Sequence, residues 1–331
     1  MGDMTEAGHR YLRANLLGKA PCFSRATDRL IQFSQCDAPV LIVGETGTGK
    51  ELAARAVHYL SARCDRAFVP VNCASLPDGL VESELFGHAR GAFTDARRAH
   101  RGLVRQAEGG TLFLDEVEAL SPHAQASLLR FLQDSSYRSV GAEECQQADV
   151  RVISASNLDL LTQVKASAFR EDLLYRLDVL KVELPSLRER PEDIDLLALH
   201  LLHKAAQLTH RSPKSLTAEA LCALRAFEWP GNVRQLEHSL LRVHLLCESD
   251  QITLHNLLSC APELSVGAPA ADASASQSLR EAKRLAVDKV ERQYVVGALF
   301  RAMGNISEAA RLCGMQRASL SKLVKKHRVA P

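Results

Sequence analysis

The chain has 331 residues, of which 46% are hydrophobic and 5% aromatic, so it can form two or three domains with mostly aliphatic cores. No apolar run approaches the roughly 20 residues that span a bilayer, and the N-terminus lacks a secretory signal. These observations predict a cytoplasmic protein without a membrane partner. The nine cysteines form no C-x-x-C pair, which is typical of reduced, buried thiols rather than of disulfides or a cysteine metal site.

The formal net charge of +2 is unevenly distributed along the chain. Residues 279–331 contain twelve Lys or Arg and only four Asp or Glu, whereas the rest of the chain has a net charge of −6. A basic segment attached to an acidic body indicates a module that binds a polyanion. A merely solvated basic face explains this composition equally well.

Short aliphatic runs alternate with helical patterns in the first half of the chain. Such runs are typical of strands buried on both faces of a parallel sheet, and they occur at residues 40–43, 68–71, 111–114, 150–155 and 179–184. From residue 186 the sequence predicts only helices, over 191–210, 217–228 and 232–248. Pro191 and Thr217 are expected helix starts, and Pro230-Gly231 is an expected break.

Residues 261–278 contain thirteen Ala, Ser, Pro or Gly among eighteen positions and show no periodic apolar face. This composition indicates a flexible linker. The predicted organisation is a short N-terminal tail over 1–14, an α/β core over 15–185, a helical lid over 186–260, the linker over 261–278, and a small all-α domain over 279–331.

The first predicted strand leads into the sequence GETGTGKE and then a helix, which is the context that a phosphate-binding loop requires. Its glycines let backbone N–H groups converge on phosphate oxygens, and Lys50 is expected to reach the β- and γ-phosphates of ATP. Glu51 replaces the Ser or Thr that usually binds Mg²⁺. The predicted nucleotide-binding residues are Gly44, Glu45, Thr46, Gly47, Thr48, Gly49, Lys50 and Glu51.

A second motif, TLFLDEV, places two carboxylates at the end of a buried strand. Ligands bind at this edge of open α/β sheets, so Asp115 is predicted to hold Mg²⁺ and Glu116 to polarise the attacking water. Seen alone, this pair is an ordinary acidic strand end. Together with the phosphate loop it predicts ATP hydrolysis.

Five motifs in order carry a resemblance to a known family: GETGTGKE, ESELFGHARGAFTDA, GGTLFLDE, FREDLLYRLDVLKVELPSLRERPEDI and WPGNVRQLEH. Over about residues 15–260 they resemble the AAA+ domain of bacterial enhancer-binding proteins, which activate transcription by sigma-54 RNA polymerase. The resemblance implies an α/β P-loop NTPase core with a helical lid. It also implies ATP bound between the subunits of a ring, usually a hexamer.

The resemblance also implies roles for polar residues around the nucleotide. Asn72 resembles the switch asparagine that pairs with Glu116 and links the nucleotide state to loop position. Asn157 resembles the first sensor of the γ-phosphate, and Arg234 resembles the second sensor, on the lid.

Two arginines in FREDLLYR, Arg170 and Arg176, resemble fingers contributed to the ATP of a neighbouring subunit. A guanidinium stabilises the charge that develops on a transferred phosphoryl group. Because Glu171 and Asp172 lie between them, the two arginines alone are more typical of a salt-bridged helix end, and it is the match of the surrounding motifs that favours the finger role.

In this family the segment around GAFTDA forms a loop whose Phe and Thr grip the sigma factor, and Phe93 and Thr94 are present here. The alternative is that Phe93 folds back onto the body. Asp95 stands where the family usually has Gly, and we expect it to weaken or retune sigma-54 engagement because Asp tolerates positive φ less well than Gly. Restoring glycine at this position and measuring promoter activation tests this expectation. A second loop over 133–149 is expected to cooperate with the first.

The segment GNISEAARLCGMQRASLSKLVKKH predicts a helix capped by Asn305, a turn at Gly314 and a second, basic helix. It resembles the Fis-type helix-turn-helix that commonly ends enhancer-binding proteins, and residues 279–303 have apolar spacing suited to a dimer. The predicted DNA contacts are base contacts by Arg317, Ser319 and Lys322 and phosphate contacts by Lys325 and Lys326.

The sequence therefore predicts a sigma-54-dependent activator that binds enhancer DNA and uses ATP and Mg²⁺ to remodel the polymerase. Two other classes fit parts of it: a ring ATPase acting as a repair or chaperone motor, and a non-enzymatic DNA-binding regulator that senses nucleotide. About fourteen residues precede the predicted core, too few for the receiver or sensor domain that most relatives carry. We therefore expect regulation by abundance or by a separate regulatory protein.

Overall fold

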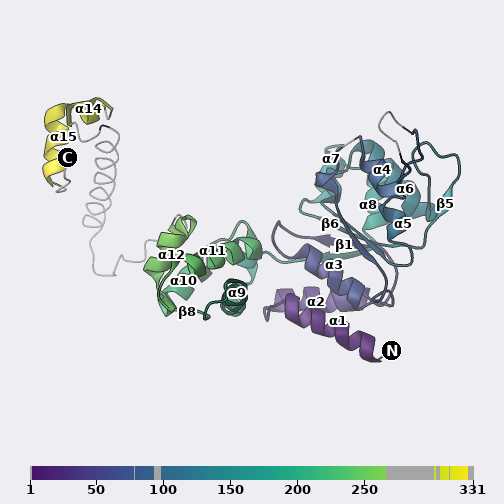
Figure 1. The fold of residues 1–331 in the computed structure, drawn as a ribbon, viewed down its shortest axis with the longest axis horizontal. Helices are drawn as coiled ribbons and strands as arrows, with labels where there is room; N and C mark the ends of the chain where they lie inside the picture. The colour runs from purple at the N-terminus through teal and green to yellow at the C-terminus, as the bar shows by residue number, and fades with distance from the viewer. Residues whose placement is uncertain are drawn as a thin grey trace. The chain divides into compact units, whose positions relative to one another are not determined.

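The computed structural model describes residues 2–77, 79–92, 98–265, 302, 306–312 and 314–326. The chain divides near residue 267 into two compact units, and each is described by itself. The first unit contains a parallel sheet with helices on both faces, followed by a helical lid (Figure 1). None of the helices in the described residues is long and apolar enough to cross a membrane.

The central sheet has five parallel strands in the order β2-β3-β6-β1-β7. These strands are β1 (Val40–Val43), β2 (Phe68–Asn72), β3 (Thr111–Asp115), β6 (Arg151–Ser156) and β7 (Leu180–Glu183). All five predicted runs form strands, and the predicted parallel sheet is confirmed. Since the carboxyl ends of parallel strands meet at one edge, the segments that follow β1, β2, β3 and β6 lie close together there.

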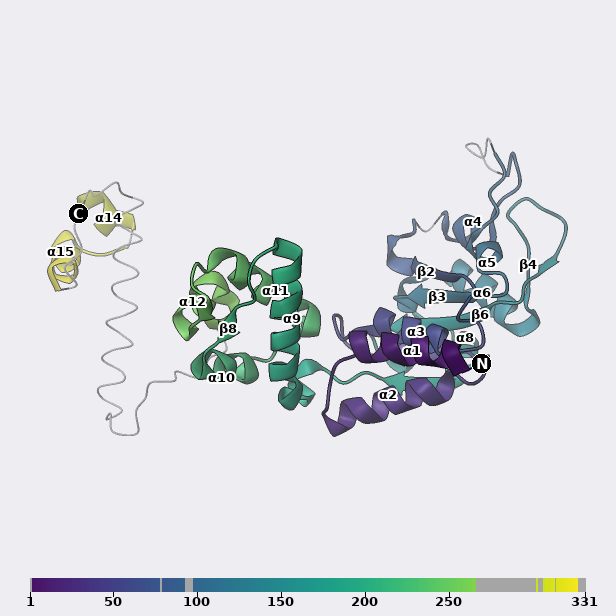
Figure 2. The same cartoon turned by 60° about the horizontal axis from the view of Figure 1, so that its bottom comes forward.

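Alternate residues of the strands enter two separate cores, because successive side chains point to opposite faces. Val40 and Ile42 pack with α1 (Gly2–Asn15), α2 (Pro21–Phe33) and α3 (Lys50–Tyr59), whereas Leu41 packs on the other face (Figure 2). The elements on that other face are α4 (Val81–Phe86), α5 (Leu103–Gln106), α6 (Pro122–Asp134), α7 (Leu160–Lys165), α8 (Glu171–Leu177), η1 (Cys73–Ser75), η2 (Val117–Ala119) and the hairpin of β4 (Ser136–Tyr137) and β5 (Gln146–Gln147).

The structure corrects the prediction of a short tail over residues 1–14. Helix α1 covers this segment, and Leu12 and Leu16 are buried in the core that α3 shares. The two helices approach so closely that a Cβ added to Gly8 would lie 2.5 Å from the backbone oxygen of Tyr59. The apolar side chains at 12 and 16 recur at helical spacing, and this pattern makes the segment part of the core.

The lid is a separate helical layer with its own core around the fully buried Trp229. It comprises η3 (Leu187–Glu189), η4 (Pro191–Asp193), α9 (Ile194–Thr209), α10 (Ala218–Ala226), α11 (Asn232–Leu246), α12 (Leu254–Cys260) and η5 (Pro262–Ser265). Thr217 caps α10, with its side chain accepting from the backbone N of Ala220, whereas Pro191 begins the 3-10 turn η4 that precedes α9.

Two details of the lid differ from the prediction. Short strands, β8 (Ser215–Leu216) and β9 (Gln251–Ile252), pair where only helices were expected. The first residues of the predicted linker belong to the lid, because Leu264 in η5 is only 3% exposed and packs into the lid core. The rest of that predicted linker, from residue 266, lies outside the described residues.

The described part of the second unit contains α14 (Ile306–Leu312) and α15 (Arg317–Lys326). Gly314 lies between them with a φ of +63°, a conformation that glycine adopts without strain. The two helices share a small core of Ala302, Ala309, Ala310, Leu320 and Val324. The predicted cap Asn305 lies outside the described residues, as does the segment 279–303 with its predicted dimer spacing, apart from residue 302.

Candidate functional site

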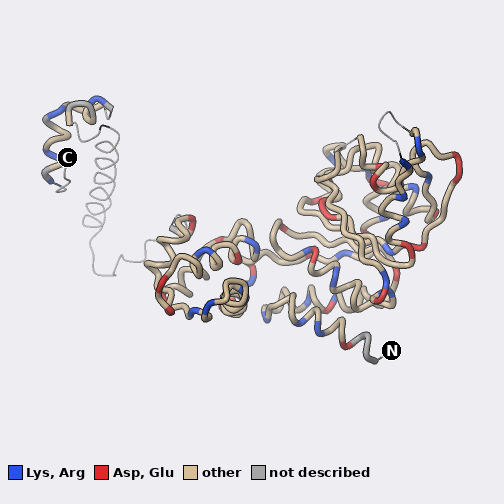
Figure 3. The backbone as a smooth tube through the Cα atoms, in the orientation of Figure 1, with Lys and Arg blue, Asp and Glu red and all other residues tan. Residues whose placement is uncertain are grey.

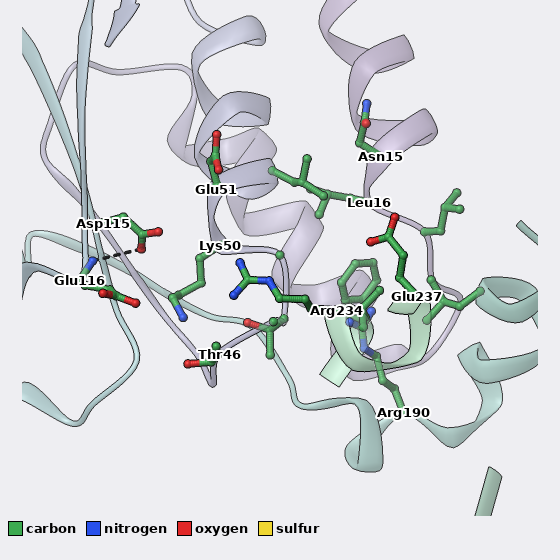
Figure 4. A pocket seen from close by; sticks show the side chains of 18 residues that line it. Asn15, Leu16, Thr46, Lys50, Glu51, Asp115, Glu116, Arg190, Arg234 and Glu237 are labelled. Atoms are coloured by element: carbon green, nitrogen blue, oxygen red, sulfur yellow. Dashed lines mark hydrogen bonds between the residues drawn. The ribbon is translucent and has the colours of Figure 1, made fainter. Parts of the chain in front are cut away.

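A cavity of about 250 Å³ lies between the carboxyl edge of the sheet and the lid. Figure 4 shows Asp115 and Glu116 on one side of Lys50 and Arg234 on the other. The cavity is lined by the phosphate loop and α3, the end of β3, the segment from the end of α1 into α2, and the lid. The lining residues are Asn15, Leu16, Leu17, Phe23, Thr46, Gly47, Thr48, Gly49, Lys50, Glu51, Leu52, Asp115, Glu116, Arg190, Leu197, Val233, Arg234 and Glu237.

The loop between β1 and α3 has the backbone of a phosphate site. Gly47 and Gly49 have φ values of +81° and +101°, which other L-residues rarely adopt. A Cβ on Gly47 would lie 2.3 Å from the backbone oxygen of Gly231 in the lid. Glycine is therefore required at position 47 both for its conformation and for its space.

Lys50 is the first residue of α3 and is only 8% exposed. Its Nζ donates to the backbone oxygens of Gly44 (2.7 Å) and Glu45 (3.2 Å). Burial lowers the pKa of Lys50, and the charge of Asp115 opposes that shift. A buried ammonium group at the N-terminus of a helix creates a strong local preference for anions such as phosphate.

Asp115 ends β3, and burial raises the pKa of its carboxyl group, opposed by the charge of Lys50. The backbone N of Glu116 donates to Asp115 Oδ1 (3.1 Å). Glu116 itself has a φ of +56°, a left-handed conformation that costs a non-glycine residue about 1–3 kcal/mol. Such strain is common where a side chain must point into a reactive site.

A third acidic residue, Glu118, lies beside this pair and was missed by the sequence analysis. Its Oε1 accepts from the backbone N of Asn157 (3.2 Å), so η2 is tied to the end of β6. The pKa of the Cys73 thiol is raised to about 12, mainly by burial and to a smaller extent by the negative charges of Asp115 and Glu118. Glu118 is an acidic residue among apolar residues that follow Asp115 and Glu116. This pattern was the sequence feature that could have identified it.

Oxygen-rich side chains fit Mg²⁺ rather than a softer metal. Asp115, Glu116 and Glu51 all line the cavity, but the Glu51 carboxylate is already paired with Arg55 on its own helix (2.8 Å). No group of three or more metal-ligating side chains occurs within the described ranges. A site of this kind suits a cation held by one or two carboxylates together with phosphate oxygens.

The two predicted asparagines lie at the same sheet edge but outside the cavity lining. Asn72 Oδ1 accepts from the backbone N of Ser75 and caps η1 (3.2 Å). Within the part of the chain that the structure describes, no hydrogen bond joins Asn72 to Glu116. Asn157 immediately follows β6, and its backbone N–H is held by Glu118.

The two predicted arginine fingers also lie outside the cavity lining. Arg170 forms an ion pair with Asp172 (2.7 Å) just before α8, as the salt-bridged interpretation of this segment expects. Arg176 lies in the last turn of α8 and is exposed. The structure therefore does not bring either arginine to the cavity of its own chain.

The end of the cavity farthest from the acidic pair is built from residues that the sequence analysis did not assign. The guanidinium of Arg190 lies 4.1 Å from the ring centroid of Phe23. Arg190 is 1% exposed, its Nε and Nη1 lack hydrogen-bond partners, and burial lowers its pKa. Arg190 lies in the motif LRERPEDI, and its place in that motif was the sequence feature that could have marked it as a site residue. Leu16 was assigned to the α/β core but was given no role in binding a ligand.

The predicted sigma-factor residues Phe93 and Thr94, with Asp95, lie outside the described residues. The base of their loop is described: the backbones of His88 and His100 exchange hydrogen bonds of 3.0 and 2.9 Å. Val140, from the second predicted loop, donates to Gly87 O and accepts from the backbone N of Ala89 (both 2.9 Å). The base of the first loop therefore lies beside the middle of the second predicted loop.

Two family models match the chain: the sigma-54 interaction domain over residues 16–183 and the AAA+ ATPase lid domain over residues 188–274. The chain belongs to the family of sigma-54-dependent transcriptional activators. Its core is therefore an AAA+ P-loop ATPase.

Relatives of this family align with most of the chain. The transcriptional regulatory protein ZraR of Escherichia coli K12 is 40% identical over 92% of this chain and 67% of its own length. The Nif-specific regulatory protein of Klebsiella pneumoniae is 44% identical over 91% of this chain and 56% of its own. NtrX of Brucella abortus, in a crystal structure with ATP, has a TM-score of 0.72 at 31% identity and covers 98% of this chain and 72% of its own. The chain thus spans 67% of the length of ZraR and 56% of the length of the Nif-specific regulatory protein.

The left-handed backbone at Glu116 predicts that Glu116→Gly relieves strain and raises the free energy of unfolding by about 1 kcal/mol. Ser135, an exposed residue with a φ of +53° at the end of α6, provides a matched control. We expect Ser135→Gly to stabilise the chain similarly but to leave ATP hydrolysis intact, whereas Glu116→Gly should abolish hydrolysis. Urea unfolding and phosphate release measure the two effects, and a destabilised Glu116→Gly variant would contradict the assigned strain.

Proposed function

We propose that this activator binds enhancer DNA, assembles into a ring and uses ATP hydrolysis to convert the closed sigma-54 promoter complex into the open complex. One observation carries this proposal. Lys50 and the Asp115-Glu116 pair meet in one cavity under the lid, in a chain whose core matches the sigma-54 interaction domain.

In the proposed chemistry, the phosphate loop and Lys50 bind the β- and γ-phosphates of ATP. Asp115 would hold Mg²⁺, which supplies charge neutralisation to the phosphates when bound. Glu116 accepts a proton from the attacking water. Arg234 projects from the lid into the cavity and would report the γ-phosphate to the lid. Asn157, at the end of β6 and outside the cavity lining, would sense the same phosphate from the sheet edge.

The ring proposal follows from the exposed position of the two arginines. Arg170 and Arg176 are too far from their own cavity to line it, yet both lie on the surface at α8. The apolar side chains Tyr175 and Val179, which are 69% and 54% exposed, lie on the same segment. Exposed apolar area beside arginines suits contact with a second copy of the chain, whose ATP would receive the guanidinium groups.

The DNA proposal concerns α15, the second helix of the small C-terminal pair. Arg317, Ser319, Lys322 and Lys326 are exposed on it, and Figure 3 shows its basic residues along the helix. The side chain of Lys325 is outside the described set. A basic helix that follows a glycine turn suits insertion into the major groove. A dimer or higher assembly would place two such helices on adjacent half-sites.

The match over residues 16–183 favours sigma-54 polymerase as the partner over a repair or chaperone substrate. The presence of Glu116 beside Lys50 favours hydrolysis over a role limited to sensing nucleotide.

Glu116→Gln tests the hydrolytic role. This variant should bind ATP normally but release phosphate at least about 100-fold more slowly, because the general base is lost. It should also fail to open a sigma-54 promoter in transcription with purified components. The exposed Glu219 of α10 offers a matched control, Glu219→Gln, which should behave as the wild type. Normal hydrolysis by Glu116→Gln would remove the proposed mechanism.

Mixed subunits test the contribution of arginines between neighbours. Arg170→Ala and Arg176→Ala should each lower hydrolysis, and mixing either one with Glu116→Gln should restore part of it, because some interfaces then pair an intact glutamate with intact arginines. Arg225 of the lid pairs with Asp195 and is as exposed as Arg170, so Arg225→Ala is the control. An absence of any recovery on mixing would show that the arginines act within one chain.

A further inference from the structure

The helix of the lid that carries Arg234 begins with Asn232, a residue with an unusual environment. Asn232 is 0% exposed and has a φ of +50°. Its backbone N donates to the backbone oxygen of Trp229 (2.7 Å), which closes a tight turn through Pro230 and Gly231. Asn tolerates this left-handed conformation better than most residues, so the turn holds its side chain in one place.

The amide of Asn232 joins three segments that are distant in sequence. Its Nδ2 donates to Glu45 Oε2 (3.1 Å) and to the backbone oxygen of Thr46 (3.0 Å), both in the phosphate loop. Its Oδ1 accepts from the backbone N of Leu187 (2.7 Å) at the start of the lid. Reversing the amide would place its oxygen against two acceptors, so the contacts define one orientation.

Glu45 extends this connection to a second lid residue. Both terminal nitrogens of Arg188 in η3 donate to the Glu45 carboxylate, one of them at 2.8 Å. The hydrogen bonds from Arg188 and then Asn232 lower the pKa of Glu45. Glu45 is therefore an anion at neutral pH, held from two sides by the lid.

The backbones of the lid and the phosphate loop are also in contact. The backbone N of Arg234 donates to Gly47 O (3.4 Å), and the Gly231 carbonyl occupies the space next to Gly47. Rotation of the lid away from the loop must break all of these contacts together. The side chain of Asn232 does not line the cavity, so it acts on the nucleotide only through the loop and the lid.

We propose that Asn232, with Glu45 and Arg188, forms a latch that holds the lid on the phosphate loop, and that opening this lid latch controls nucleotide release. Asn232 is thus a positioning residue. The inference rests on the proposed role of the cavity in binding ATP and goes beyond it, because it assigns the control of nucleotide release to hydrogen bonds between the lid and the phosphate loop made by a side chain outside the cavity lining.

The principal test is Asn232→Asp in the full chain. This change keeps the size of the side chain and an acceptor for Leu187 but replaces the two donors to the phosphate loop. Loss of two hydrogen bonds should raise the dissociation rate of a fluorescent ADP analogue about tenfold. The KM for ATP should rise by a similar factor, with a much smaller change in kcat. Asn232→Gly, which keeps the left-handed backbone without adding a charge beside Glu45, should shift both quantities in the same direction.

A matched pair of arginine variants separates the lid latch from general stability. Arg188→Gln and Arg225→Gln each break an ion pair in which the arginine is 48% exposed. Only the pair of Arg188 joins the lid to the phosphate loop, so only Arg188→Gln should speed ADP release. Both variants should melt near the wild-type temperature, since exposed ion pairs contribute little.

The outcomes distinguish the two proposals. A wild-type chain that binds neither ATP nor ADP would overturn the proposed function itself. If the wild type binds both, but Asn232→Asp and Asn232→Gly melt earlier and release ADP at the wild-type rate, Asn232 is only structural and the lid latch is wrong. Should both Asn232 variants fail to fold, equal ADP release by Arg188→Gln and Arg225→Gln would overturn it.

Discussion

The cavity under the lid depends on one close contact between backbones, that of Gly47 in the phosphate loop with Gly231 in the lid. The space that any side chain at position 47 needs is filled by the carbonyl of Gly231. Because this contact leaves no gap, the lid lies directly over the loop, and Arg234 and Glu237 join Lys50 in lining one cavity. Without the contact between Gly47 and Gly231, the sheet edge would lack the lid residues that complete the cavity lining.

The charges around the cavity are arranged at some cost to stability. Lys50 is buried and Asp115 is half-buried, and burial shifts the pKa of each toward its neutral form. Glu116 adds a strained backbone and a further carboxylate. Desolvated charge and strain are typical of sites whose ligands supply the missing compensation. A polyphosphate would supply negative charge to Lys50, and its divalent cation would supply positive charge to Asp115 and Glu116.

The sequence predicted the strands and the residues that follow them well, because apolar runs of strand length and motifs of fixed spacing are local features. Lys50, Asp115 and Glu116 meet where the parallel topology requires. The predicted tail over residues 1–14 instead forms α1, where Leu12, with Leu16 just after the helix, packs into the core although polar neighbours dominate the composition. Arg190, Glu118 and Asn232 were not given their structural roles, because each depends on contacts between distant segments. Asn232 and Glu45 are 187 residues apart in the chain.

The backbone hydrogen bonds of Val140 to Gly87 and Ala89 couple the movements of two neighbouring surface loops. One of the two neighbouring loops leaves the end of α4, and the other follows α6. These bonds join the base of the first loop to the middle of the second, so the two loops are coupled at this point. A displacement that starts at α4 or α6 therefore moves both loops together where they are bonded, instead of moving one loop past the other.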